Sequence, residues 1–288
     1  MKTILLCSDL DRTLIPNGDQ PESPGARAAL RRLSTRPQLR LAYVSGRDKT
    51  LVEEAMAKFA LPDPDFVIGD VGTTLYQIEQ GQWWIDNTWQ KEIGQDWGDR
   101  NHDYITAMLA DIDTHGLRLQ PLAKQNRYKV SYYTDAHIDP RPLKQRIAKR
   151  LEANGVNSHI IWSRDEAAQR GLLDILPRRA NKLRAIRFLM ALEDIGEAQT
   201  VFAGDSGNDL DALTSGLQAI LVANAAEDVR QTAMAHLARQ DLEGQLYLAR
   251  GGFMGLNGNY AAGVLEGLAR FFPETSAWVA EALQAAKG

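Results

Sequence analysis

Short apolar runs that stop at turn signals mark the first seventy residues of the chain. They cover residues 3–8, 39–45 and 66–68, and they end in Ser-Asp-Leu-Asp, Ser-Gly-Arg and Gly-Asp-Val-Gly. Each run is too short for a buried helix, so we expect three buried strands. Helical periodicity occupies residues 24–33 and 48–59 between them. Strand alternating with helix predicts a parallel sheet covered by helices on both faces.

The same alternation returns after residue 170 and predicts that a doubly wound, Rossmann-like α/β core continues there. Three further apolar runs have the length of strands, and four stretches have helical periodicity. We expect strands at residues 172–176, 200–203 and 218–222, and helices at residues 181–192, 209–214 and 261–272 and from residue 273 or 274 onward.

The middle of the chain follows a different pattern. Long polar stretches with helical periodicity, at residues 103–113 and 141–154, accompany runs in which apolar and polar residues alternate. We therefore predict an inserted α+β cap domain at residues 85–171, with the core formed by residues 1–84 and 172–288. The strand-like runs of the insertion lie at residues 117–121, 129–133 and 159–163.

Composition narrows the class of protein. A length of 288 residues suggests about two domains. The 37 acidic and 33 basic residues give a net charge of −4, which argues against a protein that coats nucleic acid or anionic membrane. No apolar run approaches the ~20 residues that span a bilayer. Cys7 is the only cysteine, which excludes an internal disulfide and a multi-cysteine zinc site and fits a reducing compartment. We expect a soluble, cytoplasmic protein without a targeting segment, and a monomer.

Two carboxylates and a hydroxyl follow the first predicted strand. Period-2 alternation puts Asp9, Asp11 and Thr13 on one side of the chain. The carboxyl ends of parallel strands form the ligand crevice of such a sheet. Two carboxylates at close range either bind a cation or share a proton. The alternative is that they cap a helix and complete a turn.

A second oxygen-rich turn, Gly-Asp-Ser-Gly-Asn-Asp, follows the strand expected at residues 200–203. Asp205, Asn208 and Asp209 offer oxygen ligands, and Mg²⁺ favours hard oxygen ligands. The alternative is a helix N-cap formed by Asp205 or Ser206.

Two further places carry groups suited to phosphate. Ser45, Gly46 and Arg47 end the second predicted strand, where a hydroxyl, a glycine N–H and a guanidinium could hold phosphate oxygens. The alternative is a serine turn that caps the following helix. Lys182 opens a predicted helix, where its charge opposes the macrodipole. It therefore indicates an anion or a carboxylate pair nearby, or else it is a solvated surface lysine.

Four tryptophans, Trp83, Trp84, Trp89 and Trp97, stand at the start of the middle region. Aromatic rings suit the apolar face of a sugar, but such a group also serves as domain core or hinge packing. Both interpretations remain open at this point.

The candidate residues occur in the order and spacing of the four motifs of the haloacid dehalogenase superfamily. Asp9-x-Asp11-x-Thr13, Ser45, Lys182 and Gly204-Asp205-x-x-Asn208-Asp209 carry this resemblance, which covers the whole chain. The insertion resembles the large α/β cap of the type II members. Within them, the chain is most similar to sucrose-6-phosphate phosphatases, at residues 64–66, 71–73, 129–133, 174–182 and 261–263.

The resemblance implies a Mg²⁺-dependent phosphatase. Asp9 would attack the phosphorus to give an aspartyl-phosphate, and Asp11 would protonate the leaving sugar oxygen and then deprotonate water. Ser45 and Lys182 would bind the transferring oxygens. Two departures bear on the sugar. Arg12 stands where sucrose phosphatases often have Asn, and Ser45 stands where they often have Thr.

The resemblance also implies how metal and sugar are held. Mg²⁺ would be bound by Asp9, the Asp11 carbonyl and Asp205, with Asn208 and Asp209 in support. The cap would close over the sugar, exclude water and recognise the non-reacting part of the substrate. Lys129, Ser131 and Tyr133 alternate on one face of a predicted cap strand, although Lys129 could instead be a solvated strand residue. The residues expected to bind substrate are Thr13, Gly46, Arg47, Lys129, Ser131, Tyr133 and Asn208.

The expected function is hydrolysis of a phosphorylated disaccharide or glycoside, with sucrose 6-phosphate as the first candidate. Alternatives are mannosyl-3-phosphoglycerate, mannosylfructose phosphate or glucosylglycerol phosphate as substrate. A phosphosugar mutase or a non-catalytic phosphosugar-binding protein also fits, but Asp11 argues against a pure binder, which needs no acid.

Overall fold

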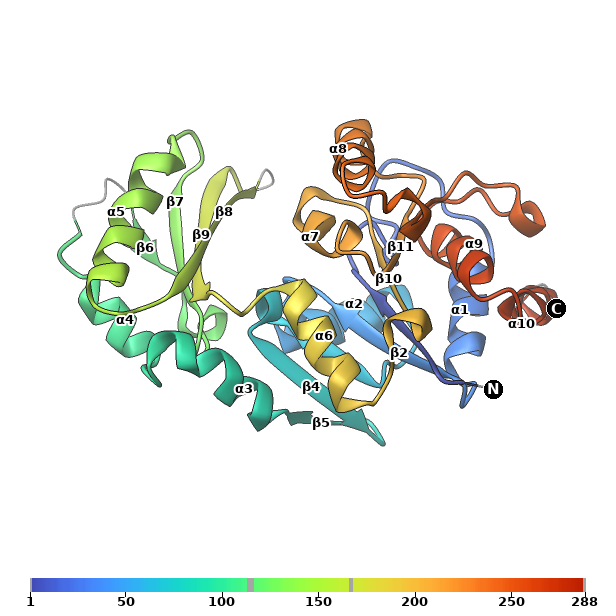
Figure 1. Cartoon of the computed structure of the whole chain (residues 1–288), viewed down its shortest axis with the longest axis horizontal. Helices are drawn as coiled ribbons and strands as arrows, with labels where there is room; N and C mark the ends of the chain where they lie inside the picture. Colours follow the sequence, from blue (N-terminus) through green and yellow to red (C-terminus); the bar gives the residue numbers. More distant parts are fainter. Residues whose placement is uncertain (1, 113–116, 166–167, 287–288) are drawn as a thin grey trace. The chain divides into compact units, whose positions relative to one another are not determined.

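The computed structural model describes residues 2–112, 117–165 and 168–286 (Figure 1). The Cα packing divides the chain into two compact units. One comprises Met1–Ile85 and Lys182–Gly288, and the other comprises Asp86–Asn181. We call them the core unit and the inserted unit and describe each by itself.

The core unit is built on one eight-stranded sheet. Its strands are β1 (Ile4–Ser8), β2 (Leu39–Val44), β3 (Phe66–Gly69), β4 (Thr74–Glu79), β5 (Gln82–Ile85), β10 (Thr200–Gly204), β11 (Gln218–Leu221) and β12 (Leu246–Leu248). They lie in the order β12-β11-β10-β1-β2-β3-β4-β5. The pairs from β12 to β3 are parallel, whereas β4 and β5 continue the sheet as antiparallel strands. The predicted α/β class is therefore confirmed.

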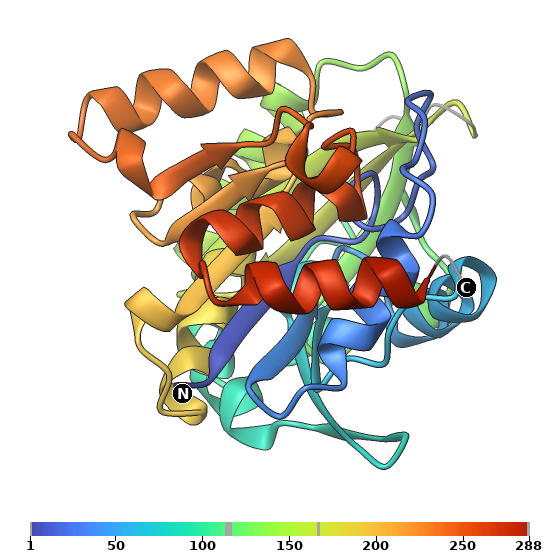
Figure 2. The same cartoon turned by 90° about the vertical axis from the view of Figure 1, so that its right-hand side faces the viewer.

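Helices cover both faces of this sheet. They are α1 (Ala26–Ser34), α2 (Lys49–Phe59), α6 (Lys182–Leu192), α7 (Leu210–Leu213), α8 (Glu227–Ala238), α9 (Ala261–Phe271) and α10 (Thr275–Ala285). α1, α2, α9 and α10 contribute Leu30, Val52, Leu265 and Val279 to one buried apolar cluster. Figures 1 and 2 show α9 and α10 on one face of the sheet and α6 and α7, which contact each other, on the other face.

Local sequence explains these elements. Ala26, Ala29, Leu30 and Leu33 recur at helical spacing, and they are the buried residues of α1. All five residues of β1 are buried, as expected of a central parallel strand that is covered on both faces.

The inserted unit is a four-stranded antiparallel sheet with helices. Its strands are β6 (Arg118–Leu119), β7 (Val130–Asp135), β8 (Ser158–Asp165) and β9 (Arg170–Pro177), in the order β6-β7-β9-β8. Its α-helices are α3 (Asn87–Gly94), α4 (His102–Met108) and α5 (Pro140–Ala153). α4 packs on β7 and α5 packs on β8, so these two helices cover the sheet.

The boundary expected between residues 171 and 172 is wrong. The run at 172–176 was expected to be a core strand, but it belongs to β9, which pairs with β7 and β8 in the antiparallel sheet. The core resumes only at Lys182. A short apolar run reveals a buried strand but not the sheet in which it pairs.

Several other elements differ from expectation. The β4–β5 hairpin, α8 and β12 were not anticipated. The helix expected at residues 103–113 is α4, which ends at Met108, and residue 113 lies outside the described residues.

The tryptophans divide between the two units. Trp83 and Trp84 belong to β5 of the core unit, where Trp83 packs edge-on against Tyr76 with ring centroids 5.3 Å apart. Trp89 and Trp97 are buried in the inserted unit. The packing interpretation is therefore confirmed for these three, whereas Trp84 is 62% exposed.

Candidate active site

The carboxyl ends of three neighbouring strands bring the candidate residues together. Asp9 follows β1, Ser45 follows β2 and Asp205 follows β10. Because β10, β1 and β2 are adjacent and parallel, these three side chains leave the sheet at the same edge.

Lys182, at the start of α6, lies between two carboxylates. Its Nζ donates to Asp9 Oδ1 at 2.6 Å, to Asp209 Oδ1 at 2.7 Å and to Asn208 Oδ1 at 3.3 Å. Lys182 is buried, which by itself would lower its pKa, but the charges of Asp209 and Asp9 outweigh burial and raise the pKa well above its ordinary value. Lys182 therefore keeps its charge, and the interpretation as a solvated surface lysine is wrong.

Three buried carboxylates form a group that fits a hard cation. Oxygens of Asp9, Asp205 and Asp209 lie within 4.8 Å of one another. Burial, together with the charges of Asp209 and Asp205, raises the pKa of Asp9 to about 8, although Lys182 opposes the shift. Burial and the charge of Asp209 raise the pKa of Asp205 to about 6. A divalent cation bound here would relieve this repulsion, and all-oxygen ligands suit Mg²⁺.

Both carboxylate oxygens of Asp209 already have partners. Oδ1 accepts from Lys182, and Oδ2 accepts from the N–H groups of Asp205 at 3.2 Å and Ser206 at 3.1 Å. A Cβ on Gly204 would lie 2.7 Å from Asp209 Cγ, so only glycine lets this carboxylate approach the turn. Asp209 thus holds the turn that presents Asp205.

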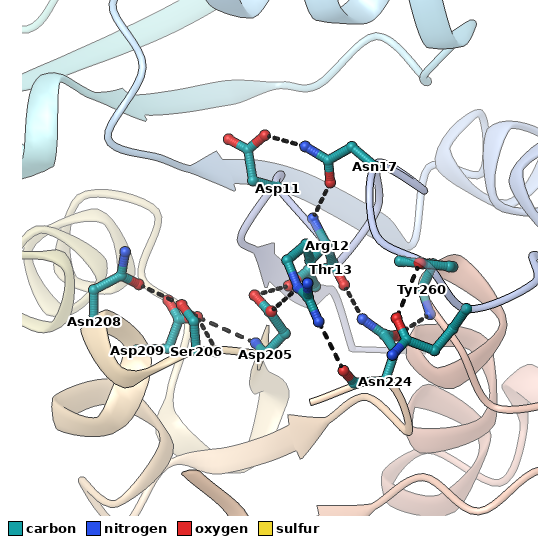
Figure 3. Close-up of polar contacts among 11 residues, drawn as sticks. Asp11, Arg12, Thr13, Asn17, Asp205, Ser206, Asn208, Asp209, Asn224 and Tyr260 are labelled. Carbon is teal, nitrogen blue, oxygen red and sulfur yellow. Dashed lines mark hydrogen bonds and ion pairs between the residues drawn. The ribbon is translucent and has the colours of Figure 1, made fainter. Parts of the chain in front are cut away.

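Residues from the first loop hold Asp205 (Figure 3). Arg12 Nε donates to Asp205 Oδ2 at 3.2 Å, and the Thr13 hydroxyl donates to Asp205 Oδ1 at 3.3 Å. Thr13, expected to bind substrate, is buried, and in this structure its hydroxyl contacts Asp205. No sequence pattern indicated this contact of Arg12.

Asp11 is held as a carboxylate by two residues. Arg47 donates from Nε to Oδ2 at 2.8 Å and from Nη2 to Oδ1 at 2.7 Å, and Asn17 Nδ2 donates to Oδ1 at 2.8 Å. Burial would raise the pKa of Asp11, but the hydrogen bonds and charge of Arg47 and the hydrogen bond of Asn17 lower it below its ordinary value. Arg47, expected to bind substrate, thus contacts Asp11 in this structure.

Ser45 and Gly46 lie at the end of β2. The Ser45 oxygen accepts from the Arg47 N–H at 3.2 Å, which is the serine turn considered as the alternative. The helix cap itself is Asp48, which accepts from the Leu51 N–H at 3.0 Å. A hydroxyl that accepts in a turn still has a proton to donate, so Ser45 keeps the capacity to bind a phosphate oxygen.

The candidate substrate residues of the inserted unit lie on one face of its sheet. Lys129 immediately precedes β7 and is only 6% exposed, so the interpretation as a solvated strand residue is wrong. The Ser131 hydroxyl donates to Asp174 on β9. The Arg170 guanidinium lies 4.4 Å from the centroid of the Tyr133 ring. This face therefore combines a buried lysine, a hydroxyl paired with a carboxylate, and an aromatic ring beside a guanidinium.

We expect the stability of the metal-free protein to fall as pH rises. The folded-state pKa of Asp9 lies above its ordinary value, so between pH ~4 and ~8 the folded protein holds a proton that the unfolded chain has released. The free energy of unfolding should therefore decrease across this window. Urea denaturation in EDTA at pH 5, 6.5 and 8 measures the decrease, which should be smaller in Asp9→Asn. Equal slopes for parent and variant would contradict the assignment to Asp9.

Within the described part of the chain, the structure contains no helix that is both long enough and apolar enough to cross a membrane.

Comparison with known proteins gives matches along nearly the whole chain. A family model described as sucrose-6F-phosphate phosphohydrolase matches residues 2–272. A protein of Nitrosococcus oceani named "Putative HAD-like hydrolase" is 60% identical over 276 residues, which are 96% of this chain and 74% of that protein. Sucrose-phosphatase 1 of Nicotiana tabacum is 29% identical over 238 residues, 81% of this chain and 53% of its own length. The chain thus spans about half the length of the tobacco enzyme.

A solved structure has a similar fold and a related sequence. The sucrose-phosphatase of Synechocystis sp. PCC6803, in complex with sucrose and phosphate, is 27% identical with a TM-score of 0.69. The match covers 94% of this chain and 99% of that one. On the strength of the family match, the chain belongs to the sucrose-6F-phosphate phosphohydrolase family, whose members are phosphoric monoester hydrolases of the haloacid dehalogenase superfamily.

Proposed function

We propose that the protein is a Mg²⁺-dependent phosphatase that hydrolyses a phosphorylated disaccharide or glycoside, with sucrose 6-phosphate as its preferred substrate. The observation that carries the chemistry is the buried Asp9 carboxylate, which lies against Lys182 and beside Asp205. Family membership and the Synechocystis neighbour support the substrate class.

Asp9 is the nucleophile in this proposal. An oxygen of its carboxylate attacks the phosphorus, the bond from phosphorus to the sugar oxygen breaks, and an aspartyl-phosphate forms. Lys182 holds Oδ1 at 2.6 Å, which fixes the orientation of the carboxylate and favours its ionised form. Water then cleaves the aspartyl-phosphate and releases inorganic phosphate.

Asp9, Asp205 and the Asp11 carbonyl would hold Mg²⁺, which neutralises charge between a carboxylate nucleophile and a dianionic ester. Asp209 would serve the site indirectly, by orienting Lys182 and the turn that carries Asp205. Its oxygens accept from Lys182 and from the N–H groups of Asp205 and Ser206. Lys182 and the Ser45 hydroxyl would bind the transferring oxygens.

Asp11 is the acid and then the base. It gives a proton to the sugar oxygen as that oxygen leaves, and in the second step it removes a proton from water. Arg47 and Asn17 stabilise its ionised form in the ligand-free protein. A dianionic ester near Arg47 would compete for the same guanidinium, so substrate binding would raise the pKa of Asp11 and favour the protonated form needed first.

The direct test is phosphate release from a panel of esters. We expect sucrose 6-phosphate to be hydrolysed faster than mannosylfructose phosphate, glucosylglycerol phosphate, mannosyl-3-phosphoglycerate and para-nitrophenyl phosphate. EDTA should abolish release and added Mg²⁺ should restore it. Transfer of phosphate between sugar positions without release would identify a mutase. Tight binding of a sugar phosphate without turnover would identify a binding protein.

Substrate choice should reside in the inserted unit. We expect Lys129→Ala to lower activity on sucrose 6-phosphate at least about tenfold more than on para-nitrophenyl phosphate, because only the sugar needs buried donors for its hydroxyls. Lys149→Ala, on the exposed side of α5, is the matched control and should change neither activity. Equal losses of Lys129→Ala on both esters would mean that Lys129 serves stability or the chemical step.

A further inference from the structure

The side chain of Asn224 links the first loop to the C-terminal part of the core unit (Figure 3). Its Nδ2 donates to the Arg12 carbonyl at 2.6 Å, and its Oδ1 accepts from the Tyr260 N–H at 2.8 Å. Arg12 Nη2 donates in turn to the Asn224 carbonyl at 3.2 Å. Asn224 is 3% exposed, so water cannot readily replace these bonds.

Both residues that this amide joins have positive φ angles, which are unusual for residues other than glycine. The φ angle is 57° at Arg12 and 51° at Tyr260. Residues other than glycine keep such angles only where the surrounding structure fixes them. Asn224 bonds the main chain of both residues, so it supplies part of that constraint at each.

The position of Arg12 matters to two expected metal ligands. The peptide that joins Asp11 to Arg12 contains the Asp11 carbonyl, and the Arg12 guanidinium donates to Asp205 at 3.2 Å. A shift of the Arg12 backbone therefore moves the Asp11 carbonyl and changes the hydrogen bonding of Asp205.

The glycine-rich segment before α9 brings the Tyr260 N–H to Asn224. Gly258 has a φ of 79°, and its carbonyl accepts from the Ala223 N–H at 2.9 Å, one residue before Asn224. A Cβ on Gly263 would lie 2.2 Å from the Gly258 carbonyl oxygen, so the start of α9 packs directly on this turn. The positive φ of Gly258 and the close contact at Gly263 explain why glycine occupies these two positions, which the sequence alone does not reveal.

We propose that Asn224 is a positioning residue for catalysis: by holding the Arg12 carbonyl, it fixes the Asp11 carbonyl and the Arg12–Asp205 contact in the geometry that binds Mg²⁺. This inference rests on the proposed function.

The test is Asn224→Asp, which keeps the size of the side chain and its acceptor for Tyr260 but removes the donor to Arg12. Asn257→Asp is the matched control. Asn257 Nδ2 likewise donates to a main-chain carbonyl, that of Pro21, at 2.8 Å, and its Oδ1 accepts from a main-chain N–H, that of Asn259, at 3.0 Å. Asn257 lies in the glycine-rich segment before α9, whose turn contacts Asn224 through Tyr260. Each of the two substitutions adds one negative charge.

We expect Asn224→Asp to lower kcat on para-nitrophenyl phosphate by about 10–100-fold, the range typical of residues that orient metal ligands. Its Mg²⁺ dissociation constant, measured by calorimetric titration without substrate, should rise about tenfold. The added negative charge would favour cation binding, so it cannot cause this weakening. Asn257→Asp should stay within about twofold of the parent in both measurements, and melting temperatures show whether the two variants are equally folded.

Three results would overturn the proposal. One is an equal effect of the two substitutions on kcat and on Mg²⁺ affinity. Another is unchanged Mg²⁺ affinity in both Asn224→Asp and the uncharged Asn224→Ala. The third is failure of both Asn224 variants to fold, which would make Asn224 a residue of the fold itself. If the parent hydrolyses no phosphate ester, the proposed function fails, whereas the Mg²⁺ titration still tests the role of Asn224.

Discussion

Replacing Asp9 by asparagine should abolish phosphate release while the protein still folds. The amide keeps the volume of the side chain but cannot attack phosphorus, so turnover should fall by at least about 10⁴-fold, as when other nucleophiles are removed. Lys182 retains its hydrogen bonds to Asp209 and Asn208. Burial makes the ionised form of Asp9 unfavourable in the metal-free protein, and its pKa is raised to about 8, so the neutral amide should not lower the melting temperature.

The measurement is phosphate release together with thermal unfolding in EDTA at pH 8. Asp19→Asn is the matched control, because Asp19 is an exposed carboxylate on the segment that follows Asp9 and Asp11. It should retain parental activity. If Asp9→Asn keeps activity within about tenfold of the parent, Asp9 is not the nucleophile.

Replacing Asp11 by asparagine should separate the two chemical steps. A sugar alkoxide is a poor leaving group, so loss of the acid should cost on the order of 10²–10⁴-fold on a sugar phosphate. A nitrophenolate leaves without a proton, so aspartyl-phosphate formation from para-nitrophenyl phosphate should be much less impaired. The base for the second step is still missing. Asp11→Asn should therefore release about one equivalent of nitrophenol per enzyme in a burst and then turn over slowly.

Rapid-mixing kinetics with both esters measures this burst. The backbone carbonyl at position 11 is retained, so Mg²⁺ affinity should change little. Asp9→Asn provides the comparison, since it should show no burst with either ester. Equal losses of Asp11→Asn on both esters, with no burst, would remove Asp11 from the acid role and leave it as a carboxylate that orients Arg47 and Asn17.

The candidate core site was predictable because of how parallel sheets are built. Asp9, Ser45 and Asp205 each follow a short apolar run, and the ends of adjacent parallel strands lie at one edge. The cost of a lysine at the start of α6 indicated a nearby anion, and the structure places Lys182 between Asp9 and Asp209. These inferences needed only local pattern and charge.

The sequence did not reveal which strands pair with one another. Residues 172–176 have the apolar character of a buried strand in either unit, and only their pairing with β7 and β8 assigns them to the inserted sheet. The β4–β5 hairpin was missed for the same reason: it extends the sheet through backbone hydrogen bonds, which any residue except proline can donate.

Local sequence patterns were enough to predict the class of fold, the family, and the candidate carboxylates and lysine of the core site, because strand ends, helix starts and motif spacing are local properties. The hydrogen-bond partners of those groups, in contrast, depend on the folded chain. Arg47 on Asp11, Arg12 on Asp205 and Asn224 on Arg12 join residues 36, 193 and 212 positions apart. A long polar side chain has many potential hydrogen-bond partners along the sequence. Only the folded backbone determines which of them lie within hydrogen-bonding distance.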